Sequence, residues 1–206
     1  MRDYFRERLN LPFEVYFTDT LCLESLLSEN EKEILANFNS QTRKQSWLLG
    51  REAIKQVVKN ISNDFDNSSL SFDTAQIKFP CNWLSLSHSA NLAIAIALPQ
   101  TIKLKGLGLD LQLNKFPKAG SEKFFVKPSE KEILNNLPKK DPAKNRCLFW
   151  TIKEACYKAN PENQNTFLSE YEITNFDLGL AKKGIHQFKF ASLALPNGFL
   201  SVAICP

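Results

Sequence analysis

The sequence lacks the features of a membrane or secreted protein. No stretch of its 206 residues approaches the roughly 20 consecutive apolar residues that a membrane-spanning helix needs. The N-terminal stretch MRDYFRERLN is charged and lacks an apolar run of signal-peptide length. We therefore expect a soluble, cytoplasmic protein that does not act on membranes.

The sequence also lacks two common chemical signatures. Its five cysteines include no CxxC pair and are odd in number, which disfavours both a zinc site and a disulfide framework. A GxSxG motif is absent too, which disfavours a Ser-His-Asp hydrolase. We expect reduced thiols, mostly in the core.

The excess of positive over negative charge is small overall but concentrated in one segment. The net charge is only +4, yet the segment 115–158 contains eleven Lys or Arg against five Asp or Glu. This segment can face an anionic partner, and a solvated lysine-rich surface explains it equally well. A nucleic-acid-binding module would need aromatic side chains on a basic face, whereas most of the sixteen phenylalanines lie in apolar patterns. We expect no nucleic-acid partner.

Hydrophobic periodicity predicts an α+β fold. Apolar residues spaced by three, four and seven predict helical structure over residues 28–61, and the Ser129-x-x-Glu132 pattern predicts a capped helix over residues 129–137. Alternating or continuous apolar runs predict strands in WLSLSHS, NLAIAIALP and KLKGLGLDLQL, and a hairpin at the C-terminal end.

Two short segments resemble each other, which suggests an internal repeat. Residues 91–98 (NLAIAIAL) align with residues 199–206 (FLSVAICP) at four apolar positions, although buried strands match this well by chance. The alignment suggests subdomains over residues 1–105 and 106–206.

The segment FWTIKEACYK (149–158) places polar residues on an amphipathic helix. Glu154 and Lys158 lie opposite the apolar face and one turn apart. On spacing alone, an exposed ion pair explains them.

The strand GLGLDLQL (106–113) has an unusual polar face. Four leucines share one side, while Gly106, Gly108, Asp110 and Gln112 share the other. Glycines in a strand mark close approach of a ligand or another backbone, and a carboxylate beside cleared space can bind a cation. A simpler interpretation is that Asp110 caps a strand at a bend.

The segment LSLSHS places Ser87 and His88 just before a buried strand. Hydroxyls, backbone N–H groups and an imidazole can together hold a phosphate. The alternative is a turn histidine bonded to neighbouring hydroxyls.

In this order, Ser87-His88-Ser89, Gly108-Leu109-Asp110 and Trp150-x-x-Lys153-Glu154-Ala155-x-x-Lys158 resemble the 4'-phosphopantetheinyl transferases. RKQSWLLGREAIKQVV (43–58) is similar to the arginine-flanked L-x-G-R helix of that family, and KFP (78–80) weakly resembles its Lys-Pro element. The length and the repeat resemble the surfactin-synthetase-activating type. The resemblance therefore implies a monomer of two similar subdomains related by a pseudo-twofold, each a small, mainly antiparallel sheet packed with helices.

The resemblance implies Mg²⁺-dependent transfer of 4'-phosphopantetheine from coenzyme A to a serine of an acyl or peptidyl carrier protein. It implies metal binding by Asp110 and Glu154 and catalysis by Asp110, Glu154 and Lys158. It also implies coenzyme contacts from a wider set of residues: Arg43, Arg51, Lys78, Ser87, His88, Lys153 and Lys158.

Gln112 departs from the family pattern, which often has an acidic residue there. Its carbonyl oxygen can bind the metal or a metal-bound water. The departure leaves open an alternative function, a homologue that binds coenzyme A without catalysis.

Overall fold

The computed structural model describes residues 1–61, 81–137 and 141–206. The helices are α1 (Arg2–Leu9), α2 (Glu29–Ala36), α3 (Gln41–Ile61), α4 (Lys131–Asn135) and α5 (Pro142–Ala159). Short 3₁₀ helices are η1 (Glu24–Leu26), η4 (Ser121–Phe124), η5 (Pro128–Glu130) and η6 (Leu168–Glu170). The strands are β1 (Glu14–Thr18), β2 (Leu84–Ser89), β3 (Leu92–Ala97), β4 (Gly106–Leu113), β5 (Glu172–Asn175), β6 (Leu180–Lys183), β7 (His186–Leu195) and β8 (Gly198–Cys205).

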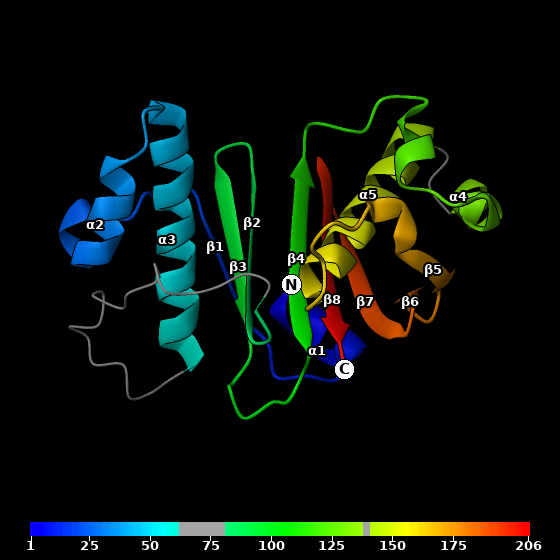
Figure 1. Ribbon diagram of the computed structural model, residues 1–206, viewed down its shortest axis with the longest axis horizontal. Coiled ribbons are helices and arrows are strands. Elements are labelled where there is room, and N and C mark those ends of the chain that lie inside the picture. Colours follow the sequence, from blue (N-terminus) through cyan, green and yellow to red (C-terminus); the bar gives the residue numbers. More distant parts are fainter. Residues whose placement is uncertain (62–80, 138–140) are drawn as a thin grey trace.

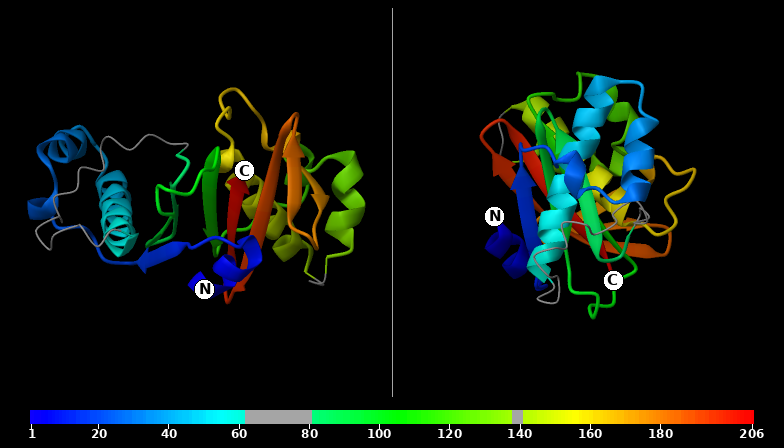
Figure 2. Two further views of the ribbon diagram at one scale, coloured as in Figure 1. Left: turned by 90° about the horizontal axis from the view of Figure 1, so that it is seen from below. Right: turned by 90° about the vertical axis from the view of Figure 1, so that its left-hand side faces the viewer.

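Two antiparallel sheets stand side by side, which confirms the predicted α+β class. The smaller has the strand order β1-β3-β2 and the larger the order β4-β8-β7-β6-β5. Helices α2 and α3 flank the smaller sheet at one end of the molecule, and α4 and α5 lie with the larger sheet at the other end (Figures 1 and 2). Within the described residues, no helix has the length and apolar character needed to cross a membrane.

The N-terminal helical region contains a break that its periodicity did not indicate. A capping box between Ser28 and Glu31 begins α2, which ends at Ala36, and α3 begins at Gln41. The apolar face of α3 then packs on β3, where Ile54 and Val57 contact a row of small alanines. A buried ion pair between Glu31 and Lys55, 2.8 Å long, joins the two helices.

The C-terminal sheet carries α5 on one face. The predicted hairpin is confirmed, because β7 pairs with β8 through a turn at Pro196 and Asn197. The predicted Ser129 cap is wrong. Its hydroxyl donates to Glu172, and the carboxylate of Glu130 accepts the Lys127 N–H instead. Helix α4 consequently begins only at Lys131.

The two halves repeat one arrangement of strands and helix. In the first half β1 pairs with β3 and β3 with β2, and in the second half β4 pairs with β8 and β8 with β7. Helix α3 precedes β2 as α5 precedes β7 in the chain. The aligned segments 91–98 and 199–206 therefore occupy the equivalent central strands β3 and β8. The division at residue 105 stays a prediction.

The glycines of β4 allow α5 to approach the strand closely. A Cβ on Gly108 would lie 1.9 Å from the Ala155 carbonyl oxygen, and one on Gly106 would lie 1.8 Å from that of Ala159. Of the two interpretations open from the sequence, the close partner is thus a backbone. On the opposite face of β4, the leucines pack with Ile94 and Ile96 of β3.

A row of serines joins β2 to β4. Strand β4 is at the edge of its sheet, and the Leu107 N–H donates to the Cys81 carbonyl oxygen at 3.1 Å. The next outward N–H groups of β4 have no strand partner among the described residues. The hydroxyls of Ser85, Ser87 and Ser89 accept hydrogen bonds from the N–H groups of Leu109, Leu111 and Leu113, at 3.0, 3.0 and 2.7 Å. We call this set of three bonds the serine ladder, and it fixes β2 beside β4.

We predict that Ser89→Ala lowers the free energy of unfolding by about 1–3 kcal/mol, because the buried Leu113 N–H loses its acceptor. Urea denaturation followed by circular dichroism measures the change. Ser25→Ala, at an exposed serine, is the control. Equal stability of the two variants would contradict the structural role of the ladder.

Candidate active site

The junction between the halves brings together the polar residues that the motifs singled out. Asp110 comes from β4, Glu154 and Lys158 from α5, and Ser87 from β2. The side chains of Asp110 and Lys158 interact directly, and Lys158 also reaches Ser87. Segments far apart in the sequence thus form one cluster, because the serine ladder and the glycines of β4 hold β2 and α5 against the same strand.

Lys158 is ion-paired with Asp110. Its Nζ lies 2.8 Å from Asp110 Oδ1 and 2.9 Å from the Leu109 carbonyl oxygen, with Ser87 Oγ at 3.4 Å. The helical spacing from Glu154 to Lys158 suggested an exposed pair between those two residues. The structure instead directs Lys158 across to β4, where its side chain is 29% exposed.

Glu154 and Asp110 form a pair of neighbouring carboxylates. Partial burial raises the pKa of Glu154, the charge of Asp110 raises it further, and Lys158 lowers it. Asp110 Oδ2 is buried and has no hydrogen-bond partner among the described residues. Two carboxylates that repel each other, one with an unpartnered oxygen, fit a divalent cation such as Mg²⁺.

These carboxylates do not form a complete protein cage for a metal. Among the described residues, no cluster of three or more His, Cys, Asp and Glu side chains is placed to hold one. Mg²⁺ commonly keeps waters and substrate phosphates as its remaining ligands, so two carboxylates are compatible with it.

Ser87 and His88 lie on β2 beside this cluster. Ser87 Oγ accepts the Leu111 N–H and donates to Asp110 Oδ1 at 3.2 Å, so its hydroxyl already has protein partners. The His88 ring lies against α3, where a Cβ on Gly50 would come 2.7 Å from its Nε2.

The pKa of His88 is lowered to about 4. Desolvation of the ring has the largest effect, and the positive charges of Lys158 and Arg51 add to it. The residue as a whole is still exposed. At neutral pH this imidazole is therefore an uncharged donor or acceptor.

The arginines predicted to hold the coenzyme differ in their placement. Arg51 is buried and stacks over the Trp47 ring at 4.8 Å, and its charge acts on His88. Arg43 is exposed and stacks over Phe38, also at 4.8 Å. Arg51 thus belongs to the junction, and Arg43 lies two turns earlier on α3. Lys78 lies outside the described residues.

Gln112 points to the loop that follows β4. Its Nε2 donates to the Lys115 carbonyl oxygen at 2.6 Å. With Trp150, Phe116 and Pro117 it lines a pocket of about 370 Å³. No hydrogen bond among the described residues joins Gln112 to Asp110 or Glu154, so its metal contact stays a prediction.

The predicted contact of Lys153 with the coenzyme stays a prediction, because the structure places this side chain in a buried ion pair. Lys153 is fully buried, and its Nζ lies 2.6 Å from Glu130 Oε2. The other Glu130 oxygen accepts the Ile173 N–H at 2.6 Å. A side chain without exposed surface cannot meet a phosphate unless it leaves this pair, so Lys153 instead connects α5 to β5 and the turn before α4.

Sequence reasoning missed Glu130. The preceding Lys127-Pro128-Ser129 indicates a turn, but the capping pattern favoured Ser129 and Glu132 as the polar residues that begin the helix. A pairing partner for Lys153 lies 23 residues away and is decided by packing.

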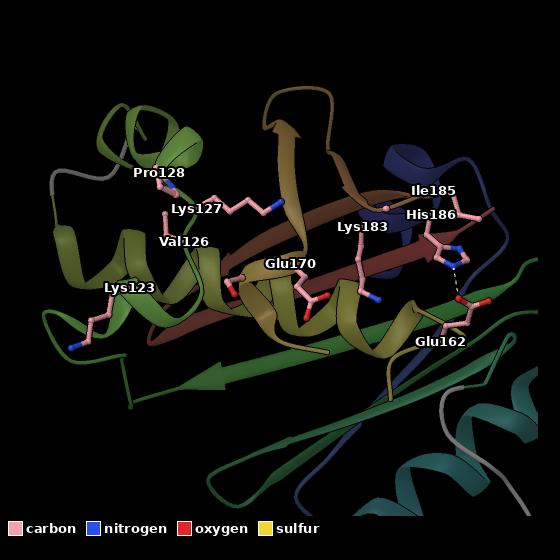
Figure 3. A pocket seen from close by; sticks show the side chains of 11 residues that line it. Lys123, Val126, Lys127, Pro128, Glu162, Glu170, Lys183, Ile185 and His186 are labelled. Atoms are coloured by element: carbon pink, nitrogen blue, oxygen red, sulfur yellow. Dashed lines mark hydrogen bonds and ion pairs between the residues drawn. The ribbon is translucent and has the colours of Figure 1, made fainter. Parts of the chain in front are cut away.

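A second pocket lies away from this cluster. It has a volume of about 720 Å³, and Lys127, Glu170, Lys183 and His186 are among its lining residues. Figure 3 shows Lys183 and His186 at one end and Lys123 at the other, with His186 bonded to Glu162 at 3.2 Å. Asp110, Glu154 and Lys158 are not part of its lining.

Comparison with known families assigns the C-terminal half of the chain. Residues 106–193 match the model of the 4'-phosphopantetheinyl transferase superfamily. This part of the chain is similar to that superfamily over 88 of the 206 residues. The match begins at β4 and includes Asp110, Glu154 and Lys158. It supports phosphopantetheinyl transferase activity, with coenzyme A as substrate and a carrier protein as acceptor. No curated protein matches the chain.

We predict that Lys153→Met destabilises the protein by about 3–5 kcal/mol, because Glu130 then keeps a buried charge without its partner. Below the melting temperature, the coenzyme A affinity of this variant should stay close to that of the wild type. Urea denaturation and calorimetry measure the two quantities. Lys144→Met, at an exposed lysine of α5, is the control. A large loss of coenzyme affinity without a loss of stability would contradict the assignment.

The lowered pKa of His88 predicts a pH-dependent stability. Between about pH 4 and pH 6.5 the unfolded state binds the proton and the folded state does not, so stability rises with pH across this window. His88→Gln should therefore lose less stability than the wild type when the pH falls from 7 to 5. Denaturant titrations at both pH values check this, and parallel losses would contradict the shift.

Proposed function

We propose that this protein transfers 4'-phosphopantetheine from coenzyme A to a serine hydroxyl of an acyl or peptidyl carrier protein, with release of 3',5'-ADP. The observation that carries the proposal is the cluster of Asp110, Glu154 and Lys158 at the junction, inside the segment that matches the transferase superfamily. Two carboxylates and a lysine suit a reaction whose substrate is a pyrophosphate.

We further propose the monomeric, surfactin-synthetase-activating type. The repeated strand arrangement of the two halves supports it. A single chain contributes both α3 and α5 to the junction, so one copy supplies all the groups described above. The five cysteines are free, and four of them are buried, which supports a reducing, cytoplasmic location.

In this proposal Asp110 and Glu154 hold Mg²⁺. The unpartnered Asp110 Oδ2 and the raised pKa of Glu154 support this role. Bound there, the ion would neutralise charge on the pyrophosphate as the phosphoryl group is transferred. Gln112 can contribute through its carbonyl oxygen, since only its amide nitrogen is engaged by Lys115.

The chain's cations and donors would hold the anionic end of coenzyme A. Lys158 is placed beside both carboxylates and would bind the reacting phosphate. His88, neutral at pH 7, would donate one hydrogen bond, and Arg51 would supply a charge that is always present. Arg43, at the exposed start of α3, would reach the outer part of the ligand. Lys153 would reach the ligand only by leaving its buried pair with Glu130.

Glu154 would accept the proton of the attacking serine. The serine oxygen forms a bond to the β-phosphorus while the bond from that phosphorus to the bridging oxygen breaks. The electron pair of the broken bond leaves with 3',5'-ADP. A carboxylate whose pKa is raised by burial is a better base than an exposed one, and it must still be ionised to act.

The lysine-rich surface would receive the carrier protein. Lys115, Lys118 and Lys123 follow β4 in the chain, and the first two line the pocket beside Trp150. Carrier proteins in this family are typically acidic around the acceptor serine, so association should weaken as salt is added.

A non-catalytic coenzyme A-binding protein is the second candidate. Gln112 favours it, because a neutral amide turned toward the Lys115 carbonyl leaves two carboxylates for the metal. This alternative predicts coenzyme binding without modified carrier protein.

The test is the intact mass of an apo acyl carrier protein and an apo peptidyl carrier domain after incubation with the protein, Mg²⁺ and coenzyme A. We predict a gain of one phosphopantetheine on at least one carrier. Glu154→Gln should lower the rate by roughly 10²–10⁴-fold, because the proton acceptor and a metal ligand are lost together.

Glu132→Gln, at an exposed residue of α4, is the matched control and should retain wild-type activity. A fully active Glu154→Gln variant would refute the role of Glu154. Unchanged carriers, together with coenzyme binding in calorimetry, would favour the non-catalytic candidate.

A further inference from the structure

Lys158 and the proposed metal compete for the same carboxylate. The ammonium group lies 2.8 Å from Asp110 Oδ1 and also donates to the Leu109 carbonyl oxygen. Asp110 is almost fully enclosed, with 9% of its side chain exposed. In the structure described here, the counter-ion of Asp110 is therefore a residue of the chain itself.

A divalent cation on Asp110 would lie close to a positive charge. Metal–oxygen bonds are about 2.1 Å for Mg²⁺, so an ion on either oxygen of this carboxylate stays within a few ångströms of Lys158 Nζ. Arg51, from α3, adds a positive charge near His88, while His88 itself adds none at neutral pH. Glu154 is the second carboxylate at this position. The positive charge of Lys158 thus acts on both carboxylates before any metal arrives.

The pyrophosphate of coenzyme A would remove this conflict. Its negative charges give Lys158 an alternative partner, and the long side chain can follow them because it is 29% exposed. The Ser87 Oγ contact at 3.4 Å is a weak restraint on that movement. Once Lys158 turns to a phosphate, Asp110 Oδ1 keeps only the Ser87 hydrogen bond and Oδ2 has no partner among the described residues, so the carboxylate can bind a metal.

We infer that Lys158 is the resident counter-ion of Asp110, and that this contact disfavours metal binding until coenzyme A draws the lysine away. The inference rests on the proposed function, because it assumes that Asp110 and Glu154 hold the metal. Lys158 then has two successive partners, Asp110 before substrate binding and a phosphate afterwards. Metal and coenzyme would bind cooperatively, since each favours the arrangement that the other needs.

The experiment measures Mn²⁺ binding by calorimetry, with and without coenzyme A. Without coenzyme, Lys158→Met and Lys158→Gln should bind Mn²⁺ at least about tenfold more tightly than the wild type, the lower end of the effect of a neighbouring charge on an ionisable group. The glutamine variant keeps a hydrogen-bond donor for Asp110, which protects the measurement if the methionine variant folds poorly. Coenzyme A should raise the Mn²⁺ affinity of the wild type.

Two further variants serve as controls. Lys144→Met removes a charge from an exposed position of the same helix and should leave Mn²⁺ affinity unchanged. Asp110→Asn, combined with either Lys158 change, should abolish the tight Mn²⁺ binding that the Lys158 variants gain. Thermal unfolding provides a second measurement, since Mn²⁺ alone should raise the melting temperature of the Lys158 variants more than that of the wild type.

Equal Mn²⁺ affinities for the wild type and both Lys158 variants would overturn the inference. So would tight binding that survives Asp110→Asn, because the metal would then lie elsewhere. These failures differ from failure of the proposed function, in which the wild type leaves the carrier proteins unmodified even with coenzyme A and metal at saturation.

Discussion

The serine ladder is the interaction on which the rest of the structure depends. Each of its hydrogen bonds contributes only about 0.5–1.5 kcal/mol, yet together they satisfy three amides at the open edge of β4. An edge with unpaired amides would otherwise be open to another strand. Hydroxyls on alternate residues of β2 match the repeat of β4, because both strands advance by two residues between groups that face the same way. The ladder therefore sets the register between the halves as well as their separation.

The candidate active site follows from that register. Ser87 accepts the Leu111 N–H in the ladder and also donates to Asp110. The same residue therefore joins the halves and contacts a carboxylate of the site. On the other side of β4, Gly108 lets α5 approach until Glu154 and Lys158 reach the same carboxylate. Glu130 holds the neighbouring Lys153 and thereby limits how α5 can turn. A buried ion pair adds little net stability, but its geometry is specific, which suits a helix that must present one face accurately.

Electrostatics at the junction are balanced within the chain. Asp110 and Glu154 interact with Lys158, Arg51 lies near His88, and the lowered pKa of His88 keeps its imidazole uncharged at neutral pH. A pyrophosphate and a divalent metal together add opposite charges to this balance, whereas either alone disturbs it. Three neighbouring basic residues of the motifs thus differ in state: Lys158 pairs with Asp110, Lys153 pairs with Glu130, and His88 is uncharged at neutral pH.

The sequence by itself determined the elements and the faces. Strict alternation in residues 106–113 defined which side of β4 carries Asp110, and helical spacing separated Glu154 and Lys158 from the apolar face of α5. The similarity of residues 91–98 and 199–206 indicated equivalent strands, which the shared pairing order bears out. Only the tertiary structure decided the partners. Lys158 binds Asp110, Lys153 binds Glu130, and the serines of β2 bind amides of β4, across 48, 23 and 24 residues of chain. Local periodicity reports the direction of a side chain relative to its own element, whereas a partner this distant depends on how separate elements pack.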